Sequence, residues 1–186
     1  MAKVNPAVEK VRKALKAAGL DDKVTALKAP LSKPEAAAKE LGAEAGQILQ
    51  TLVYFIGKRM VLVLVAGDHA VIEANLGAAL FMQGEVRKPT AAELKGATGF
   101  TAGTVPPVGL PGKLPAVIDH SLKRFRHVFA AAGDAGHAFR IGVPELMKLT
   151  QGIVSYNVAK PLEGVVVAPP PRKRTKTFTG ERKLPG

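Results

Sequence analysis

A run of glycine and proline residues carries the clearest chemical signal in this chain. Residues 98–111, TGFTAGTVPPVGLP, hold three glycines, three prolines and no charged side chain. Glycine adopts backbone dihedral angles that other residues avoid, and proline fixes them. Such a loop is stiff and leaves backbone N–H groups free to meet a ligand at close range, whereas a plain spacer is usually more polar. We therefore predict that residues 98–111 form one wall of a binding site.

Other common catalytic and metal-binding patterns are missing from the sequence. The chain has no cysteine, which excludes a disulfide framework, a thiol nucleophile and a thiolate metal site. Its histidines lack a metal-ligand spacing such as His-x-x-x-His, and we expect no metal or organic cofactor. They are His69, His120, His127 and His137. No Gly-x-Ser-x-Gly elbow and no phosphate-binding loop occurs, so a triad hydrolase and a P-loop enzyme are not supported.

The chain is strongly basic, with 27 Lys and Arg against 15 Asp and Glu and a formal net charge of +12. A field of this sign attracts polyanions, of which RNA and DNA are the obvious ones. The last fifteen residues contain six basic side chains and one acidic one. The candidate RNA contacts in this tail are Arg172, Lys173, Arg174 and Lys176. A solvated terminal extension, a generally basic surface and a DNA-associated protein that relies on the tail are the alternatives.

The composition favours one globular domain followed by a tail. The hydrophobic fraction of 47% supports a real core, and the aromatic fraction of 5% makes that core aliphatic. No apolar stretch approaches the roughly 20 residues needed to cross a bilayer, and the first residues lack the apolar block of a signal peptide. We expect a domain over residues 1–160, a Pro-rich basic tail over residues 161–186, and a cytoplasmic location.

The pattern of apolar residues predicts a mixture of helices and strands. The expected helices are 5–18, 33–41, 73–82, 91–95 and 144–149, and the expected strands are 23–29, 48–56, 60–66, 116–119, 126–130, 138–141 and 153–158. Ser32 with Glu35 and Thr90 with Glu93 have the spacing of a helix capping box. Because helices and strands do not alternate strictly, we predict an α+β fold with a mixed, mainly antiparallel β-sheet flanked by helices.

A succession of short motifs resembles one known family. In chain order the motifs are Ala36–Gly42, Gly46–Ile48, Thr51–Val53, Val61–Asp68, Ala97–Phe100, Gly103–Pro107, Val117–Asp119 and Ala131–Gly133. Together they resemble the YbaK/prolyl-tRNA-synthetase-associated domains, which are free-standing aminoacyl-tRNA editing deacylases. Each motif is weak alone, but their order over roughly residues 5–158 is specific. The resemblance implies a curved mixed sheet.

The resemblance also implies an activity and partners. The expected reaction is hydrolysis of the ester that joins a wrong amino acid to tRNA, a second sieve for amino acids that binding energy alone cannot separate. The expected partner is the 3′ aminoacyl end of tRNA, and the expected substrates are of the tRNA(Pro) type. An aminoacyl-tRNA synthetase is a further candidate partner. Family members use a ribose hydroxyl of the substrate, so no protein nucleophile is required.

The site implied by the resemblance is a pocket for the terminal adenosine and the aminoacyl group. Its Gly-x-x-x-Pro element corresponds to residues 103–107, where Gly103 permits close approach and neighbouring N–H groups stabilise the ester oxyanion, each worth about 3 kcal/mol. The implied substrate-binding residues are Thr51, Asp68, Thr98, Gly99, Gly103, Thr104, Val105, Pro106, Pro107, Asp119 and Gly133. For Asp68, Thr98, Asp119 and Gly133, a plain role in a turn or strand end is the alternative.

One position departs from the family pattern. The family has a lysine directly before its Ser/Thr-Leu-Val strand, with the ammonium at the reaction centre, whereas this chain has Gln50. A glutamine amide can orient a carbonyl, but it lacks the charge that strengthens a hydrogen bond. We predict Gln50 and Gly103 as catalytic residues of a deacylase. Three interpretations stay open: Gln50 works at a reduced rate, another cation (Lys39, Lys58 or Lys95) substitutes, or the chain binds RNA without cutting the ester.

Overall fold

The computed structural model describes residues 5–165, so the four tail residues predicted to contact RNA lie outside the described part. The helices are α1 (Pro6–Ala17), α2 (Pro34–Leu41), α3 (Leu76–Ala79), α4 (Ala91–Thr98) and α5 (Val143–Thr150), with short 3-10 helices η1 (Ala45–Gln47), η2 (Glu73–Asn75) and η3 (His120–Arg124). The strands are β1 (Val24–Ala26), β2 (Leu49–Ile56), β3 (Arg59–Ala66), β4 (His69–Val71), β5 (Val86–Arg87), β6 (Ala116–Asp119), β7 (His127–Ala131), β8 (His137–Gly142), β9 (Ile153–Ser155) and β10 (Ala159–Pro161).

The strands form three sheets, of which the largest has the order β5-β2-β3-β6-β9. The other two have the orders β1-β8-β7 and β10-β4. Strand β3 runs parallel to β6, and β6 runs parallel to β9, while the remaining pairs are antiparallel. A single parallel bridge between Ile48 and Phe129 joins the largest sheet to the three-stranded one. The predicted mixed, mainly antiparallel α+β fold is therefore confirmed.

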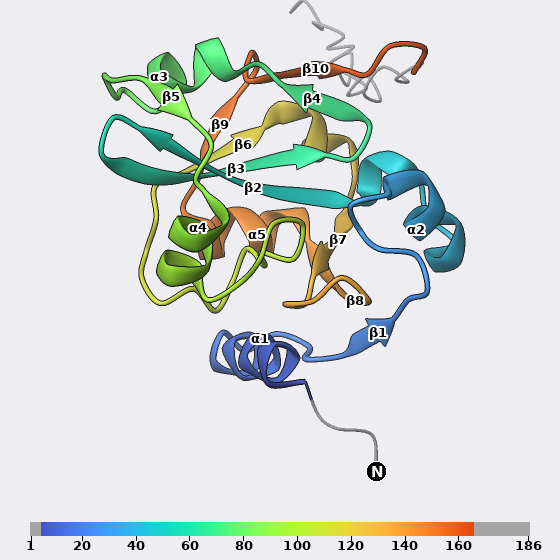
Figure 1. Cartoon of the computed structure of the whole chain (residues 1–186). Helices are drawn as coiled ribbons and strands as arrows, with labels where there is room; N and C mark the ends of the chain where they lie inside the picture. Colours follow the sequence, from blue (N-terminus) through green and yellow to red (C-terminus); the bar gives the residue numbers. More distant parts are fainter. Residues whose placement is uncertain (1–4, 166–186) are drawn as a thin grey trace, which may run out of the picture.

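The core lies on both faces of the largest sheet. Residues 61–66 of β3 are all buried, which explains why this strand is continuously apolar rather than alternating. Its even-numbered side chains pack with α1 and α5, and its odd-numbered ones pack with Leu76 and Leu80. Figure 1 accordingly shows α3 on one side of the sheet and α1, α4 and α5 on the other.

The glycine- and proline-rich run is anchored at both ends. Gly99 ends α4 in a left-handed conformation (φ 81°), and its N–H donates to the Lys95 carbonyl at 2.9 Å. Phe100 and Val105 then insert into the core, whereas residues 101–103 are exposed. The run is therefore a fixed loop with an exposed tip that faces the sheet from the α4 side.

A two-residue hairpin turn at Gly57 and Lys58 joins β2 to β3, since Ile56 pairs with Arg59 and Gly57 has a φ of 59°. One of the predicted capping boxes is confirmed. The second capping box is present at α4, where the Thr90 hydroxyl accepts from the Glu93 N–H at 3.2 Å and Glu93 accepts from the Thr90 N–H at 2.8 Å. Arg87 also binds the Glu93 carboxylate, and these hydrogen bonds lower the pKa of Glu93 to about 2.

Other local predictions are wrong or too long. The prediction of a capping box at Ser32 is wrong. The Lys33 N–H donates to the Pro30 carbonyl at 2.9 Å in a turn, and Lys33, not Ser32, is the residue directly before α2. The helix expected over residues 73–82 is broken into η2 and α3. The strand expected over residues 23–29 shrinks to β1, and β4, β5 and β10 were not predicted, since strands of two or three residues carry almost no periodic signal.

Two glycines offer a matched test of this packing. Gly133 has a φ of 97°, and a Cβ there would lie 2.7 Å from the Ala7 carbonyl oxygen, whereas a Cβ at Gly96 in α4 would meet nothing within 4 Å. We expect Gly133→Ala to lower the free energy of unfolding by about 2 kcal/mol or more, because backbone must move. Gly96→Ala should raise it by about 0.5–1 kcal/mol. Urea unfolding of both variants checks the pair, and equal effects would contradict the packing described.

Candidate functional site

Strand β2 leaves part of one edge open. It pairs with β3 along its whole length, but on its other edge β5 reaches only Phe55 and Ile56, and β7 makes its single bridge at Ile48. Among the described residues, no backbone hydrogen bond outside the β2–β3 ladder involves residues 50–54. Backbone N–H and C=O groups that have no partner in the protein are free to bind a ligand. The open edge is therefore a place where an extended or planar ligand can hydrogen-bond.

A cavity of about 250 Å³ lies along this open edge. The four consecutive residues 51–54 of β2 form one side, and Ala102, Gly103 and Val105 of the loop form another. Side chains alternate between the faces of a strand, so a cavity lined by four residues in a row runs beside the edge rather than over one face. Leu94 of α4, together with Lys88 and Pro89, completes the wall.

Thr51 lines this cavity, and its hydroxyl oxygen is buried without a hydrogen-bond partner among the described residues. Thr51 is 8% exposed, and its Oγ1 is the only buried side-chain nitrogen or oxygen atom among residues 5–165 with no hydrogen bond. Burying a hydroxyl without a partner costs on the order of 1–3 kcal/mol. A ligand group that fills the cavity and pairs with Oγ1 recovers that energy.

Gly103 lines the cavity with Thr51 and also lies near the turn that holds the predicted catalytic residue Gln50. It is exposed with a φ of 77°, and a Cβ there would lie 3.6 Å from Cβ of Ser32. The Gln50 amide nitrogen donates to the carbonyl of Leu31, the residue before Ser32, at 3.0 Å. Gln50 is thus near Gly103 through the Leu31–Ser32 turn, but its side chain does not line the cavity that Thr51 lines.

The loop itself offers unused N–H donors. The Thr104 N–H and hydroxyl both bind the Thr101 carbonyl, at 3.1 and 2.9 Å, and the Thr104 hydroxyl accepts from the Thr101 N–H. By contrast, the N–H groups of Ala102 and Gly103 have no acceptor among the described residues. The tip of the loop therefore holds its shape through threonines and presents two free donors beside the cavity.

Several predicted substrate-binding residues have structural partners instead. The fully buried Thr98 hydroxyl donates to the Leu94 carbonyl at 2.7 Å and accepts from the Phe100 N–H at 3.1 Å. Gly133 is held against Ala7 of α1. Pro106 and Pro107 are buried and brace the loop.

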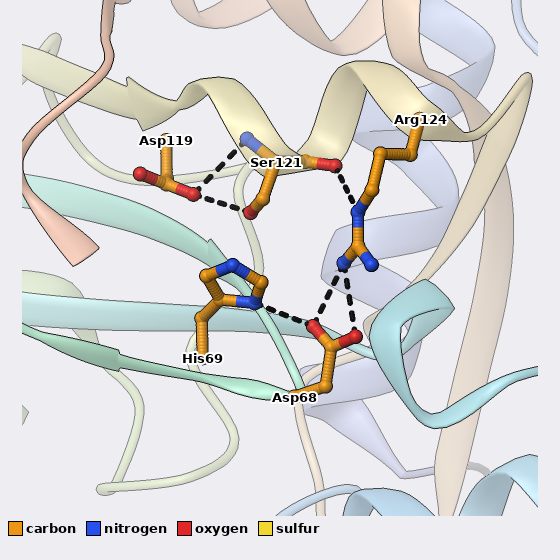
Figure 2. A network of polar contacts seen from close by, with 5 residues as sticks. All are labelled: Asp68, His69, Asp119, Ser121 and Arg124. Atoms are coloured by element: carbon orange, nitrogen blue, oxygen red, sulfur yellow. Dashed lines mark hydrogen bonds and ion pairs between the residues drawn. The ribbon is translucent and has the colours of Figure 1, made fainter. Parts of the chain in front are cut away.

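Asp68 and Asp119 belong to one polar network, which Figure 2 shows. Arg124 Nη2 donates to both oxygens of Asp68, at 2.8 and 3.0 Å, and His69 Nδ1 lies 2.7 Å from the same carboxylate. Arg124 Nε donates to the Ser121 carbonyl at 2.8 Å, and Asp119 accepts the Ser121 N–H at 3.1 Å. Burial opposes the charged form of Asp68, but hydrogen bonds and charge from Arg124 and His69 outweigh it and lower the pKa of this carboxyl.

This network lies apart from the cavity at β2. Asp68 borders a different hollow of about 590 Å³, with Gly67 and Pro34 among its walls, and the two cavities share no lining residue. Gly46 makes room for the network, because a Cβ there would lie 2.7 Å from Asp68 Oδ2 and 2.9 Å from Arg124 Nη2. The contacts around both carboxylates fix the junction of β3, β4 and η3.

The lysines considered as substitutes for the family lysine do not line the cavity. Lys39 and Lys58 are exposed, and the Lys95 ammonium donates to the Gly99 carbonyl at 2.9 Å. Lys88 does line it, with its Nζ 3.8 Å from Glu73 Oε1. Sequence reasoning missed Lys88 because it lies outside every motif, two residues before the residue that caps α4.

Within residues 5–165, no three His, Asp or Glu side chains gather closely enough to hold a metal ion. Over the same residues, no helix has the length and apolar character that crossing a membrane requires. The described part of the chain is therefore an α+β domain with an open strand edge at β2 and a small cavity beside it.

Comparison with known proteins identifies the family. Residues 28–149, more than half of the chain, match the model of the aminoacyl-tRNA editing domain. The chain therefore belongs to the aminoacyl-tRNA editing domain family, which confirms the resemblance carried by the motifs. A crystal structure described as that of a candidate trans-editing enzyme for prolyl-tRNA synthetase is 34% identical, with a TM-score of 0.76 over 85% of this chain and 99% of that one.

Curated relatives include both long and short proteins. The proline–tRNA ligase of Lactobacillus helveticus is 32% identical over 105 residues, which are 56% of this chain and 18% of the ligase. The chain thus spans less than a fifth of this ligase. The uncharacterised protein YwhH of Bacillus subtilis is 27% identical over 144 residues, which are 77% of this chain and 90% of that protein.

The Asp68 network can be tested through stability. Because the pKa of Asp68 is lowered in the folded protein, its charge stabilises the fold above the unfolded-state pKa of about 3.9, and this stabilisation disappears as the pH falls through the folded-state value. We expect Asp68→Asn to lower the free energy of unfolding by about 2–3 kcal/mol at pH 7, because Arg124 is left buried without its partner. As the pH falls below about 4, the difference between the wild type and the variant should begin to shrink, and it should vanish once the pH is below the folded-state pKa of Asp68.

Urea unfolding across pH measures this difference. Glu163→Gln is the control, since Glu163 is exposed and has no ion pair or side-chain hydrogen bond with described residues. A difference between wild type and Asp68→Asn that stays constant from pH 7 to pH 3 contradicts the assignment.

Proposed function

We propose that the protein is an aminoacyl-tRNA deacylase that removes a wrongly attached small amino acid from the 3′ end of tRNA. The observation that carries the proposal is the unpartnered hydroxyl of Thr51, a residue that lines the small cavity together with Gly103. Membership of the editing family and the similarity to a candidate trans-editing enzyme for prolyl-tRNA synthetase support it. The same two findings lead us to propose further that the substrates are of the tRNA(Pro) type and that a synthetase is a partner.

The cavity dimensions suit one part of such a substrate. At about 250 Å³ the cavity is smaller than the roughly 300–1,000 Å³ typical of sites for drug-sized ligands, and it fits an aminoacyl group better than a whole nucleotide. The side chains of Leu52, Val53 and Val105 provide apolar walls, and the Thr51 hydroxyl provides one polar contact. The terminal adenosine then lies outside the cavity, along the loop.

The reaction is hydrolysis of an ester. Water, or a ribose hydroxyl of the substrate that water later displaces, attacks the ester carbonyl carbon, and the bond from that carbon to the 3′ oxygen breaks. The amino acid leaves as a carboxylate, and the 3′ oxygen takes up a proton. We assign the free N–H groups of Ala102 and Gly103 to the oxyanion, where each such donor is worth about 3 kcal/mol. Gln50 positions the turn at Leu31 or orients the carbonyl after its bond to Leu31 is released.

A second candidate function is RNA binding without cleavage. The observation that favours it is the uncharged Gln50, whose amide is engaged by Leu31 and does not line the cavity. Incubation with Ala-tRNA(Pro) and Cys-tRNA(Pro), for wild type and Gln50→Lys, separates the two. Turnover by the wild type supports the deacylase. Turnover by the variant alone indicates a binding protein that lost its charge, and no turnover by either overturns both the activity and the assignment of the cavity.

The Thr51 hydroxyl gives a sharper test of the same site. Thr51→Val removes the hydroxyl at nearly constant volume, and we expect kcat/KM for deacylation to fall about tenfold, as for loss of one hydrogen bond of about 1.4 kcal/mol. Since Oγ1 has no partner in the free protein, the same substitution should not lower the free energy of unfolding. Thr51→Ser, which keeps the hydroxyl, is the matched control and should retain most of the activity. Loss of stability in Thr51→Val without loss of activity contradicts the assignment.

A further inference from the structure

We infer that a basic hollow on the outer face of the β1-β8-β7 sheet binds the sugar–phosphate backbone near the 3′ end of the tRNA. The inference rests on the proposed function for the identity of the RNA, but it concerns a surface that lies outside the cavity at β2. The basic hollow is defined by Lys23, Arg126, His127, Phe129 and Arg140. Its volume is about 760 Å³, three times that of the cavity.

Only some of the arginines in residues 5–165 form ion pairs with carboxylates. Residues 5–165 contain six arginines, and Arg12, Arg87 and Arg124 form ion pairs with carboxylates. Of the other three, Arg126 and Arg140 both line the basic hollow, both are exposed, and neither donates a side-chain hydrogen bond to a described residue. A free guanidinium matches a phosphate group with two parallel hydrogen bonds. Two of them in one hollow favour an anionic polymer.

Two acidic side chains, those of Asp21 and Glu145, also border the hollow. Asp21 accepts the N–H of Lys23 at 2.9 Å, and the Glu145 carboxylate lies close to Gly142 at the start of α5. An adjoining hollow of about 560 Å³ shares Arg126 and Glu145 with it and adds Lys123. Cations therefore outnumber carboxylates around the rim.

Two aromatic rings make RNA a better match than a simple anion. His127 and Phe129 point outward from β7 and meet edge to face, with ring centroids 5.7 Å apart, and both are half-buried. Unpaired bases stack on aromatic rings and on guanidinium planes, and cations beside them hold the phosphates. A hollow that combines both chemistries suits a single-stranded RNA segment such as the 3′ end of tRNA.

The basic hollow is close to the candidate catalytic residues. Phe129 is bridged to Ile48, only two residues before Gln50, and the Gln47 side chain donates to the His127 carbonyl at 3.3 Å. Phe129 also packs on the apolar cluster that contains Leu31, whose carbonyl binds Gln50. At about 3.3 Å per strand residue, the hollow begins on the order of 10 Å from Gln50. Adjacent nucleotides of one strand can span that distance.

Binding of uncharged tRNA tests the surface without requiring catalysis. The test variant is Arg126→Gln/Arg140→Gln, and the matched control is Lys58→Gln/Arg59→Gln at the β2–β3 turn, which removes the same charge at the far end of the hairpin. We expect the test variant to bind about tenfold more weakly in 100 mM salt, and the slope of log K against log salt to fall by about 1.4, or about 0.7 for each lost contact. The control should stay within about twofold of wild type. If the two variants bind tRNA equally well, the proposal is overturned. The surface would then be a candidate contact for a protein partner and not for RNA.

Turnover provides a second readout. With aminoacyl-tRNA, the test variant should lose kcat/KM by the same factor as affinity, whereas with 3′-O-aminoacyl-adenosine, which is too short to reach the hollow, it should match wild type. An equal loss on both substrates means that the arginines act on the catalytic cavity, and it overturns the proposal. If wild type cleaves neither substrate, the deacylase proposal fails, and the salt dependence of tRNA binding still decides whether this surface binds RNA.

Discussion

The incomplete pairing of one edge of β2 is the constraint on which the rest of the site depends. Between the bridge at Ile48 and the two residues paired with β5, β2 pairs with no other strand of residues 5–165 on that side. A bare edge in a sheet is normally covered or paired. Here α4 and the following loop approach it and leave a small cavity between them. The capping box that starts α4 and the left-handed Gly99 that ends it set where the loop begins, and Phe100 and Val105 hold it against the core.

The alternation of side chains along β2 divides the site into two parts. The Gln50 side chain binds the carbonyl of Leu31, whereas Thr51 lines the cavity. Gly103 adjoins both parts of the site, because it lies near Ser32 and also lines the cavity. A family lysine in place of Gln50 would bring charge to the first part only. The cavity, its free backbone donors and the Thr51 hydroxyl do not depend on that charge, so the proposed binding site does not require the lysine.

The fold was more accessible from the sequence than the site. The β2–β3 hairpin, the capped α4 and the stiff loop follow from local patterns, because glycine, capping residues and β-branched runs act over a few residues. The pairing of Asp68 with Arg124 does not, since the two residues are 56 positions apart in the chain. Whether the Thr51 hydroxyl finds a hydrogen-bond partner depends on which residues the fold packs around it. No local sequence pattern indicates that it has none. Thr98 and Gly133 fit the family motif equally well, yet their contacts hold α4 and α1 in place.

The central claim is that an aminoacyl ester lies between the open edge of β2 and the loop at Gly103. Titration of the ¹⁵N-labelled protein with a non-hydrolysable amide analogue of 3′-aminoacyl-adenosine, followed by NMR, measures this directly. The account predicts that the largest amide shift changes cluster at Thr51, Ala102 and Gly103, next to the cavity. Shift changes centred on Gly67 and Asp68, which border the separate hollow at the Arg124 network, would contradict it.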